Sequence, residues 1–193
     1  MKRHNAEKGF TLIELLVIIA IIGLLGSIIF ASLKTAAGKA RDANRKAQMK
    51  SLQNALEAYY NDYGKYPDTG MAIYSSEPNN NINAPYGYQD NGDWIPGLVT
   101  GGYISSLPHD PLLGKGNNNP NYCAGWMGGG VGNSWIGAYD YISDGKNYKL
   151  LSHCAPEFFI GGRIDSPTNP FYDPRRTDHA WMVCSGEPAC SNW

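Results

Sequence analysis

The sequence predicts an α+β protein in which a long N-terminal helix is joined to a C-terminal head built on an antiparallel β-sheet. An apolar run over residues 10–33, continued by helix-periodic residues as far as position 63, predicts the helix. Alternating apolar residues on both sides of Asp144-Gly145 predict a β-hairpin in the head. With 193 residues, the chain has room for one domain and an anchor.

Residues 10–33 form the first half of the predicted helix, and Glu14 is the one charged residue among them. At 1.5 Å per residue this run extends roughly 36 Å, enough to cross a hydrocarbon core of about 30 Å. We therefore predict that it spans a membrane. A carboxylate in such a segment is costly, so Glu14 implies a positively charged partner, which another copy of the protein would supply. Alternatively, its side chain only reaches the membrane interface.

Residues 34–63 form an amphipathic second half of the same helix. Small and apolar residues recur there every three to five positions: Ala36, Ala40, Ala43, Ala47, Leu52, Ala55, Leu56, Tyr59 and Tyr63. Gly64 predicts a C-cap, and Pro67 prevents continuation. The whole helix, from Phe10 to Tyr63, would be roughly 80 Å long.

The head, residues 64–193, is rich in Gly, Asn and Pro and should contain many loops. The hairpin strands are predicted at 139–143 and 147–153, and a third strand at 180–184, giving a sheet of three or four strands on the second half of the helix. Residues 68–138 show little pattern. Their tryptophans, Trp94, Trp126 and Trp135, either pack the loops onto the sheet or form a partner-binding surface.

Charge is unevenly distributed along the chain. Residues 34–50 hold six basic side chains and one acidic side chain, a net charge of +5, whereas residues 51–193 carry 7 basic and 14 acidic ones, a net charge of −7. The basic stretch could contact lipid headgroups or the acidic head of a neighbouring copy. DNA capture is the least favoured alternative, because the stretch lacks interleaved aromatic residues and an acidic head repels phosphate.

The first residues carry a family resemblance. A basic leader ends at Gly9, and Phe10-Thr-Leu-Ile-Glu14 then opens the apolar run. This pattern resembles a type IV prepilin, and the pseudopilins of type II secretion and of competence systems share it. The resemblance implies that a prepilin peptidase cuts after Gly9 and methylates the new N-terminus, Phe10. Glu14 would then be the fifth residue and would pair with the freed amine of Phe10 in another subunit.

The same resemblance implies the organisation and the partners. Residues 1–9 would be a cleaved leader, 10–33 the transmembrane and assembly half of the helix, 34–63 its amphipathic half and 64–193 the head, a pilin-like α+β fold. The partners would be further copies in a homopolymeric filament, the prepilin peptidase, an inner-membrane assembly platform and membrane lipid. Tyr103 to Pro111 is similar to the Leu-Pro-x-Asp-Pro segment of major pseudopilins, as is the Tyr-x-x-Asp-Gly pattern of the hairpin.

Orientation and cysteine content bear on localisation. More positive charges follow the apolar run than precede it, so the positive-inside rule alone would place the C-terminus in the cytoplasm. The prepilin-like leader and a cysteine-bearing head require the opposite, a single-pass subunit of the cytoplasmic membrane with its N-terminus inside and its head outside. An even number of cysteines in an exported, loop-rich head favours disulfides over zinc, and we expect Cys184–Cys190 with Cys123–Cys154.

Calcium is the one ligand that the resemblance to major pseudopilins suggests, and no other cofactor is expected. Oxygen ligands for it could come from Asp140, Asp144 and Asn147, or from Asp165, Asp173 and Asp178. The chain has no EF-hand spacing, and aspartates are common in turns.

The sequence therefore favours a structural subunit of a type IV pilus or pseudopilus. An enzyme is not expected, because His4, His109, His153 and His179 are scattered and no nucleophile elbow or phosphate loop is present. The alternative is a membrane-tethered extracytoplasmic binding or adhesion domain that does not polymerise. Sequence alone does not distinguish a pilus from a pseudopilus.

Overall fold

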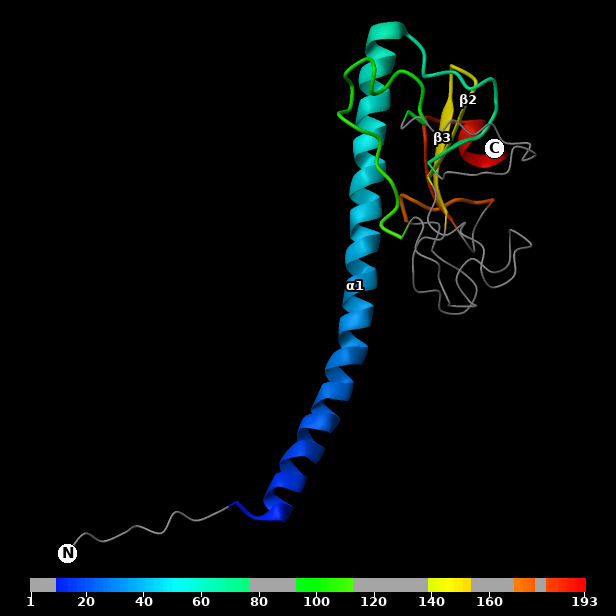
Figure 1. Cartoon of the computed structure of the whole chain (residues 1–193). Helices are drawn as coiled ribbons and strands as arrows, with labels where there is room; N and C mark the ends of the chain where they lie inside the picture. Colours follow the sequence, from blue (N-terminus) through cyan, green and yellow to red (C-terminus); the bar gives the residue numbers. More distant parts are fainter. Residues whose placement is uncertain (1–9, 77–92, 113–138, 154–168, 176–179) are drawn as a thin grey trace, which may run out of the picture. The chain divides into compact units, whose positions relative to one another are not determined.

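The computed structural model describes residues 10–76, 93–112, 139–153, 169–175 and 180–193. The chain forms two compact units, residues 1–38 and residues 39–193. Helix α1, Leu12–Tyr63, has residues in both units (Figure 1), and the β-strands β1 to β4 belong to the second. The predicted combination of an N-terminal helix with a C-terminal antiparallel sheet is confirmed.

Helix α1 ends where the sequence predicts. Gly64 adopts the left-handed conformation, φ +66°. Its amide donates to the carbonyl of Tyr60 at 2.7 Å. This is a C-cap that satisfies a carbonyl of the last turn, and glycine adopts the conformation without steric penalty. At the other end the helix begins at Leu12, two residues after the predicted start at Phe10.

Among the residues that the structure describes, none of the helices combines the length and the apolarity that a membrane crossing requires. This finding gives no support to the membrane-spanning segment predicted at 10–33, which stays a prediction.

The sheet has four antiparallel strands in the order β1 (Tyr74–Ser75), β2 (Tyr139–Ser143), β3 (Tyr148–His153) and β4 (Ala180–Cys184). The predicted hairpin corresponds to β2 and β3, and the predicted third strand to β4. In the turn between β2 and β3, Asp144 Oδ1 accepts the amides of Lys146 at 2.9 Å and Asn147 at 2.7 Å. Gly145 has φ +82°, which explains the Asp-Gly signal.

Two short elements were not predicted. Strand β1 has two residues, too few for an alternating pattern to be visible. Helix α2, Ala189–Asn192, has four residues and contacts β3 and β4. Neither has the length from which a periodicity can be recognised.

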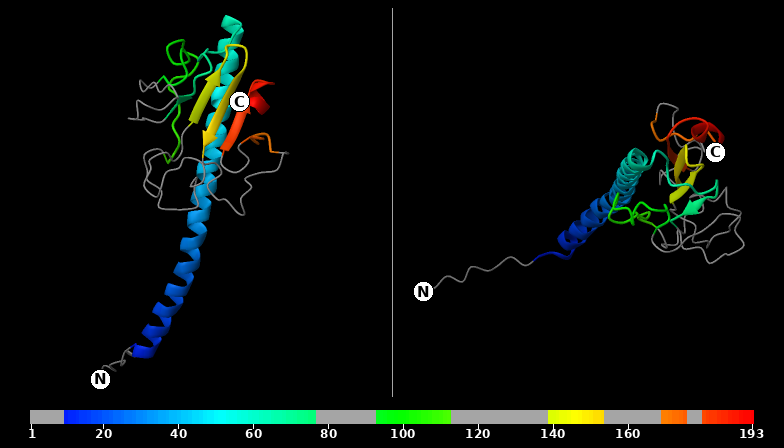
Figure 2. Two further views of the ribbon diagram at one scale, coloured as in Figure 1. Left: turned by 90° about the vertical axis from the view of Figure 1, so that its right-hand side faces the viewer. Right: turned by 90° about the horizontal axis from the view of Figure 1, so that it is seen from above.

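The core of the second unit lies between α1 and one face of the sheet (Figure 2). From α1 it takes Met49, Leu52, Ala55 and Leu56; from the segment 93–112 it takes Trp94, Ile95, Leu98 and Leu107; and from the sheet it takes Tyr139, Tyr141, Tyr148, Leu150 and Trp181. The period of two along each strand brings the last group to one face.

Trp94 is buried and stacks on Tyr139, with ring centroids 6.2 Å apart. For this tryptophan the packing alternative is therefore confirmed. Trp126 and Trp135 lie outside the described residues.

Candidate functional site

The first turn of α1 holds Glu14, the residue that the sequence singles out for assembly. Thr11 precedes the helix, and Glu14 is the third helical residue. Glu14 Oε2 accepts hydrogen bonds from the Thr11 amide at 2.9 Å and from the Thr11 hydroxyl at 2.6 Å. The Thr11 hydroxyl in turn accepts the amide of Glu14 at 3.3 Å. This reciprocal arrangement is a capping box, which satisfies backbone donors that a helix start leaves unpaired.

Thr11 is a functional candidate that the sequence interpretation did not include. The signal was present, because Thr-x-x-Glu immediately before an apolar run is the pattern of a capping box. Gly9 lies outside the described residues. Phe10 is described, precedes the helix and is 71% exposed.

The surface around Glu14 is apolar on every side of the helix. The large apolar side chains described between Phe10 and Leu33 are all exposed, from 41% for Ile18 to 82% for Leu12. Because they occupy consecutive positions, they do not form a single stripe facing a core. An apolar surface of this extent calls for cover by lipid or by other protein.

The basic stretch at 34–50 has a different surrounding from the one we expected. Arg45 is fully buried, and its Nε donates to Asp110 Oδ2 at 2.5 Å while Nη2 donates to Asp110 Oδ1 at 3.0 Å. Its Nη1 donates to Asp42 Oδ1 at 2.7 Å. Lys46 lies 4.5 Å from the centre of the Trp181 ring and 5.7 Å from that of Phe171.

Two of the basic side chains are thus directed to residues of their own chain. This reduces the charge available for lipid, for a neighbouring copy or for DNA. Lys39 and Lys50 are exposed, and Lys50 donates to Gln53 at 2.7 Å. Asp110, which lies outside residues 34–50, offsets one positive charge, so the stretch together with this buried partner carries +4 (+5 − 1).

Comparison with known proteins places these features in a family. The family model described as the prokaryotic N-terminal methylation motif matches residues 4–30, which include Gly9, Phe10 and Glu14. The type II secretion system core protein G of Vibrio cholerae is 33% identical over 113 residues, covering 58% of this chain and 69% of that protein. The chain belongs to the pilin and pseudopilin family.

Two further relatives are similar to this pilin-family chain. The core protein G of Escherichia coli K12 is 30% identical over 161 residues, covering 78% of the chain and 89% of that protein. The type IV major pilin protein PilE1 of Neisseria gonorrhoeae is 28% identical over 112 residues, covering 58% and 67%. No solved structure matches. In line with the sequence interpretation, these relatives are structural proteins and not enzymes.

The cysteines of the pilin-family head are described in part. Cys184 and Cys190 form a disulfide, with Cα atoms 5.4 Å apart, as predicted. Cys123 and Cys154 lie outside the described residues, so that pairing stays a prediction. Both cysteines that the structure describes are therefore in a disulfide bond.

The described candidates for calcium binding are engaged in other contacts. Asp140 Oδ2 lies 2.7 Å from His153 Nε2, and Asp173 Oδ1 lies 3.1 Å from Lys149 Nζ. Asp144 accepts two amides of the hairpin turn, and these bonds hold its pKa below the usual range although burial opposes them. Within the described ranges, no three His, Cys, Asp or Glu side chains gather as ligands would. Asp165 and Asp178 lie outside the described residues, so calcium binding by the head stays a prediction.

Proposed function

We propose that this chain is a structural subunit of a type IV pilus or pseudopilus filament. It is made as a precursor, cut by prepilin peptidase between Gly9 and Phe10, methylated at Phe10 and assembled through α1. The observation that carries the proposal is Glu14 in the first turn of α1, where the large apolar side chains described between Phe10 and Leu33 are all exposed, within the match to the N-terminal methylation motif. The family relatives support it.

The exposed apolar side chains must be kept out of water both before and after assembly. Leaving one Leu, Ile or Phe side chain in water costs about 1.5–3 kcal/mol relative to burying it. Because lipid tails are as apolar as these side chains, transfer from lipid to protein adds close packing and not a hydrophobic gain. A helix that is apolar on all sides is covered either by lipid or by protein. Before assembly, residues 10–33 would lie in the membrane, and after assembly they would pack among the same residues of neighbouring copies.

Glu14 would direct the geometry of that packing. Once Gly9 is removed, each subunit has a positively charged amine at Phe10, and the Glu14 carboxylate of a neighbouring copy is its counter-charge. In the single chain, the Thr11 amide and hydroxyl already bind one carboxylate oxygen of Glu14. Because a carboxylate accepts more than two hydrogen bonds, the amine can be added without breaking the capping box.

The proposed location follows from the leader and the head. The subunit would cross the cytoplasmic membrane once, with its N-terminus inside and its head outside, and an inner-membrane platform would extract it into the filament. The disulfide between Cys184 and Cys190 agrees with an oxidising compartment for the head. Lys39, which is exposed, would contact anionic lipid headgroups or a neighbouring subunit.

The experiment compares wild type with Glu14→Ala and Glu14→Gln in the cells that make the protein. Mass spectrometry of the membrane fraction should find N-methylated Phe10 as the first residue in all three. Electron microscopy of sheared surface fractions should show filaments for wild type and a large loss for both variants, because an unpaired buried amine costs about 3–5 kcal/mol. Lys50→Ala, on an exposed side chain, is the matched control and should assemble normally.

Three results would contradict parts of the proposal. An intact Met1 terminus in the mature fraction would refute processing. Normal filaments from Glu14→Ala would refute the pairing role. A cut and methylated wild-type protein that forms no filament, even when overproduced with its assembly platform, would favour the membrane-tethered domain that does not polymerise.

A further inference from the structure

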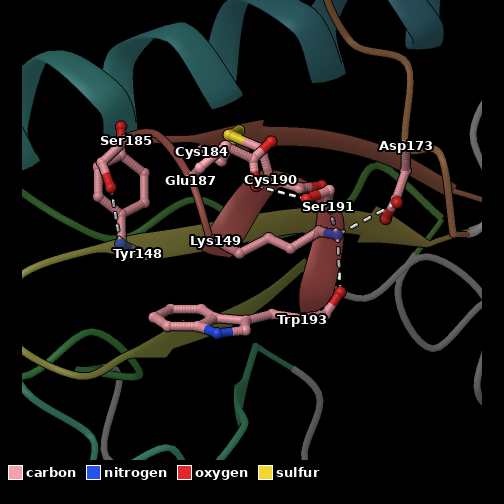
Figure 3. The surroundings of a disulfide bond; sticks show 9 residues. All are labelled: Tyr148, Lys149, Asp173, Cys184, Ser185, Glu187, Cys190, Ser191 and Trp193. Carbon is pink, nitrogen blue, oxygen red and sulfur yellow. Dashed lines mark hydrogen bonds and ion pairs between the residues drawn. A yellow bond between two sulfur atoms is a disulfide. The ribbon is translucent and has the colours of Figure 1, made fainter.

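The face of the sheet that points away from α1 holds a buried lysine. Lys149 is the second residue of the hairpin strand β3 and is 0% exposed. Its ammonium nitrogen Nζ lies 3.1 Å from Asp173 Oδ1 and 2.9 Å from the backbone oxygen of Trp193 (Figure 3). The backbone oxygen of Cys190 lies 3.5 Å away. A buried ammonium group is costly unless it is paired and hydrogen-bonded. The three oxygens therefore stabilise Lys149 in its buried position.

Two of the three oxygens come from the segment that follows β4. This segment, residues 185–193, includes α2, and a helix of four residues has no stability of its own. Its position depends on contacts with the sheet. The Tyr148 amide donates to the Ser185 hydroxyl at 2.9 Å, and Lys149 binds the carbonyls at the other end of the segment. Cations are favoured at this end of a helix because its carbonyls point outward.

The disulfide fixes the same segment beside the same lysine. In the register of β3 and β4, Cys184 is the direct partner of Lys149. Cys190 lies in α2, and its own carbonyl is one of the oxygens near Lys149 Nζ. The Cys184–Cys190 bond therefore returns the chain over Lys149 after β4 ends (Figure 3).

We propose that the Cys184–Cys190 disulfide and Lys149 form a redox-controlled latch that holds residues 185–193 over the outer face of the sheet. A dithiol reductant would open it. The dithiol supplies two electrons and two protons, the bond between the sulfur atoms of Cys184 and Cys190 breaks, each becomes a thiol, and the dithiol becomes a disulfide. Residues 185–193 then move away, the two carbonyl oxygens leave Lys149, and water takes their place around an amine that keeps Asp173.

The latch needs both the disulfide and the hydrogen bonds of Lys149, because neither alone holds residues 185–193 on the sheet. Without the disulfide, carbonyl hydrogen bonds must hold a short segment against its conformational entropy, and each is worth only about 0.5–1.5 kcal/mol, or up to about 3 to a charged group. With the disulfide, the released segment stays close and re-forms the contacts. The latch therefore closes where disulfides form and opens where thiols are kept reduced. It concerns the head itself and does not depend on filament assembly.

The test measures how fast the Lys149 amine reacts in the full chain in detergent. Sulfo-N-hydroxysuccinimide acetate is added for short times, and acetylation of each lysine is read by mass spectrometry. Lys146 and Lys50, both exposed, are internal controls. In the oxidised protein Lys149 should be protected. After dithiothreitol it should react at least about tenfold faster, since closing so short a loop limits the open state substantially, while Lys146 and Lys50 keep their rates. Reoxidation should restore protection.

Two variants separate the latch from the rest of the molecule. Cys123→Ser/Cys154→Ser removes the other cysteines, and the response of Lys149 to dithiothreitol should persist in it. Lys149→Met keeps the length of the side chain without its charge. With the disulfide intact, it should increase hydrogen exchange at the amides of Cys190 and Asn192, which bond to Gly186 and Pro188. Exchange at β2 should stay unchanged.

Three outcomes would overturn the proposal. The first is unchanged Lys149 acetylation when alkylation shows that Cys184 and Cys190 are both reduced. The second is a gain of exchange across β2 on reduction, which would mean general unfolding and not local opening. The third is loss of the response in Cys123→Ser/Cys154→Ser, which would place the redox dependence elsewhere. The first two outcomes are measured by reduction and reoxidation of the wild-type chain, so they do not depend on a variant that must fold.

Discussion

Arg45 and Asp110 form a buried ion pair with two hydrogen bonds between residues 65 positions apart. The guanidinium comes from α1 and the carboxylate from the segment 93–112, and both side chains are 0% exposed. Asp110 Oδ1 also accepts the Leu112 amide at 2.8 Å. The pair therefore fixes the end of this segment on the helix, beside Leu107 of the core.

Replacing one member of this pair should destabilise the head strongly. Breaking a buried pair by removing one partner costs about 3–5 kcal/mol. After Asp110→Ala the buried Arg45 guanidinium keeps Asp42 as a partner, so we expect a loss at the lower end of this range. The free energy of unfolding in urea, followed by tryptophan fluorescence, measures the loss. Arg45→Met/Asp110→Ala, which removes both charges, should recover part of it. Lys50→Ala should change the free energy by less than about 0.5 kcal/mol. Equal stability of wild type and Asp110→Ala would contradict the importance of the pair.

The capping box at the start of α1 can be tested without a filament. Thr11→Val keeps the shape of the side chain but removes the hydroxyl, and loss of such a cap costs about 0.5–2 kcal/mol of helix stability. Amide hydrogen exchange of the first turn in detergent should therefore increase. Ser27→Ala, further along α1, is the control: the Ser27 hydroxyl donates to the Leu24 carbonyl at 2.7 Å, so its removal should leave the first turn unaffected. Exchange rates that do not respond to Thr11→Val would show that the cap has no role there.

Elements with a strong local signal were predictable from the sequence. The helix from about residue 10 to 63, its glycine cap, the Asp-Gly hairpin and the strand at 180–184 depend on periodicity and turn chemistry that a few neighbouring residues specify. The Cys184–Cys190 pair was also predictable, because few residues separate the two.

Features that depend on tertiary contacts were not predictable in the same way. The basic residues of the stem gave no sign that Arg45 would be buried, since its partner Asp110 is far along the chain. Lys149 lies between Tyr148 and Leu150 in a strand whose alternation gives no sign that a lysine is buried, and its burial depends on contacts with the later segment 185–193. At the start of the helix, the sequence interpretation gave Glu14 only the role of a charge to be paired, whereas in the structure its side chain also caps the helix.

The turn between β2 and β3 requires glycine for conformational reasons. At Gly145, φ +82°, an added Cβ would lie 3.7 Å from the nearest atoms of Asp68, an ordinary contact distance. The cost of Gly145→Ala therefore comes from the backbone, at about 1–2 kcal/mol. Gly145→Asn should lose less, because asparagine tolerates the left-handed conformation better. Thermal unfolding of the two variants beside wild type checks the order. An equal loss in both would point to the side chain and not to the backbone conformation.

Buried tyrosines should make the head unstable at alkaline pH. Burial is the main cause that raises the pKa of Tyr66 to about 12, with the negative charge of Glu57 adding to it. Burial likewise raises the pKa of Tyr139, Tyr141 and Tyr148. In the unfolded chain a tyrosine ionises near the ordinary value of about 10.

The direction of the effect follows from proton binding. Above pH 10 the unfolded chain binds fewer protons than the folded one, so the free energy of unfolding falls as pH rises from about 10 through 12. Stability should be constant with respect to these groups below pH 10. Urea unfolding between pH 8 and 12, with tyrosinate absorbance recorded in parallel, measures both the fall and the delayed ionisation.

Tyr148→Phe identifies the contribution of one hydroxyl. The Tyr148 hydroxyl oxygen is buried, and no hydrogen bond of good geometry to it is found in the part of the chain that the structure describes, although Gln53 and Glu57 lie near enough to affect its pKa. Its removal should therefore change stability at pH 8 by less than about 1 kcal/mol, or increase it slightly. The same substitution should make the fall above pH 10 less steep, because one raised pKa is gone. A curve for Tyr148→Phe that coincides with wild type above pH 10 would show that this hydroxyl ionises normally in the folded protein.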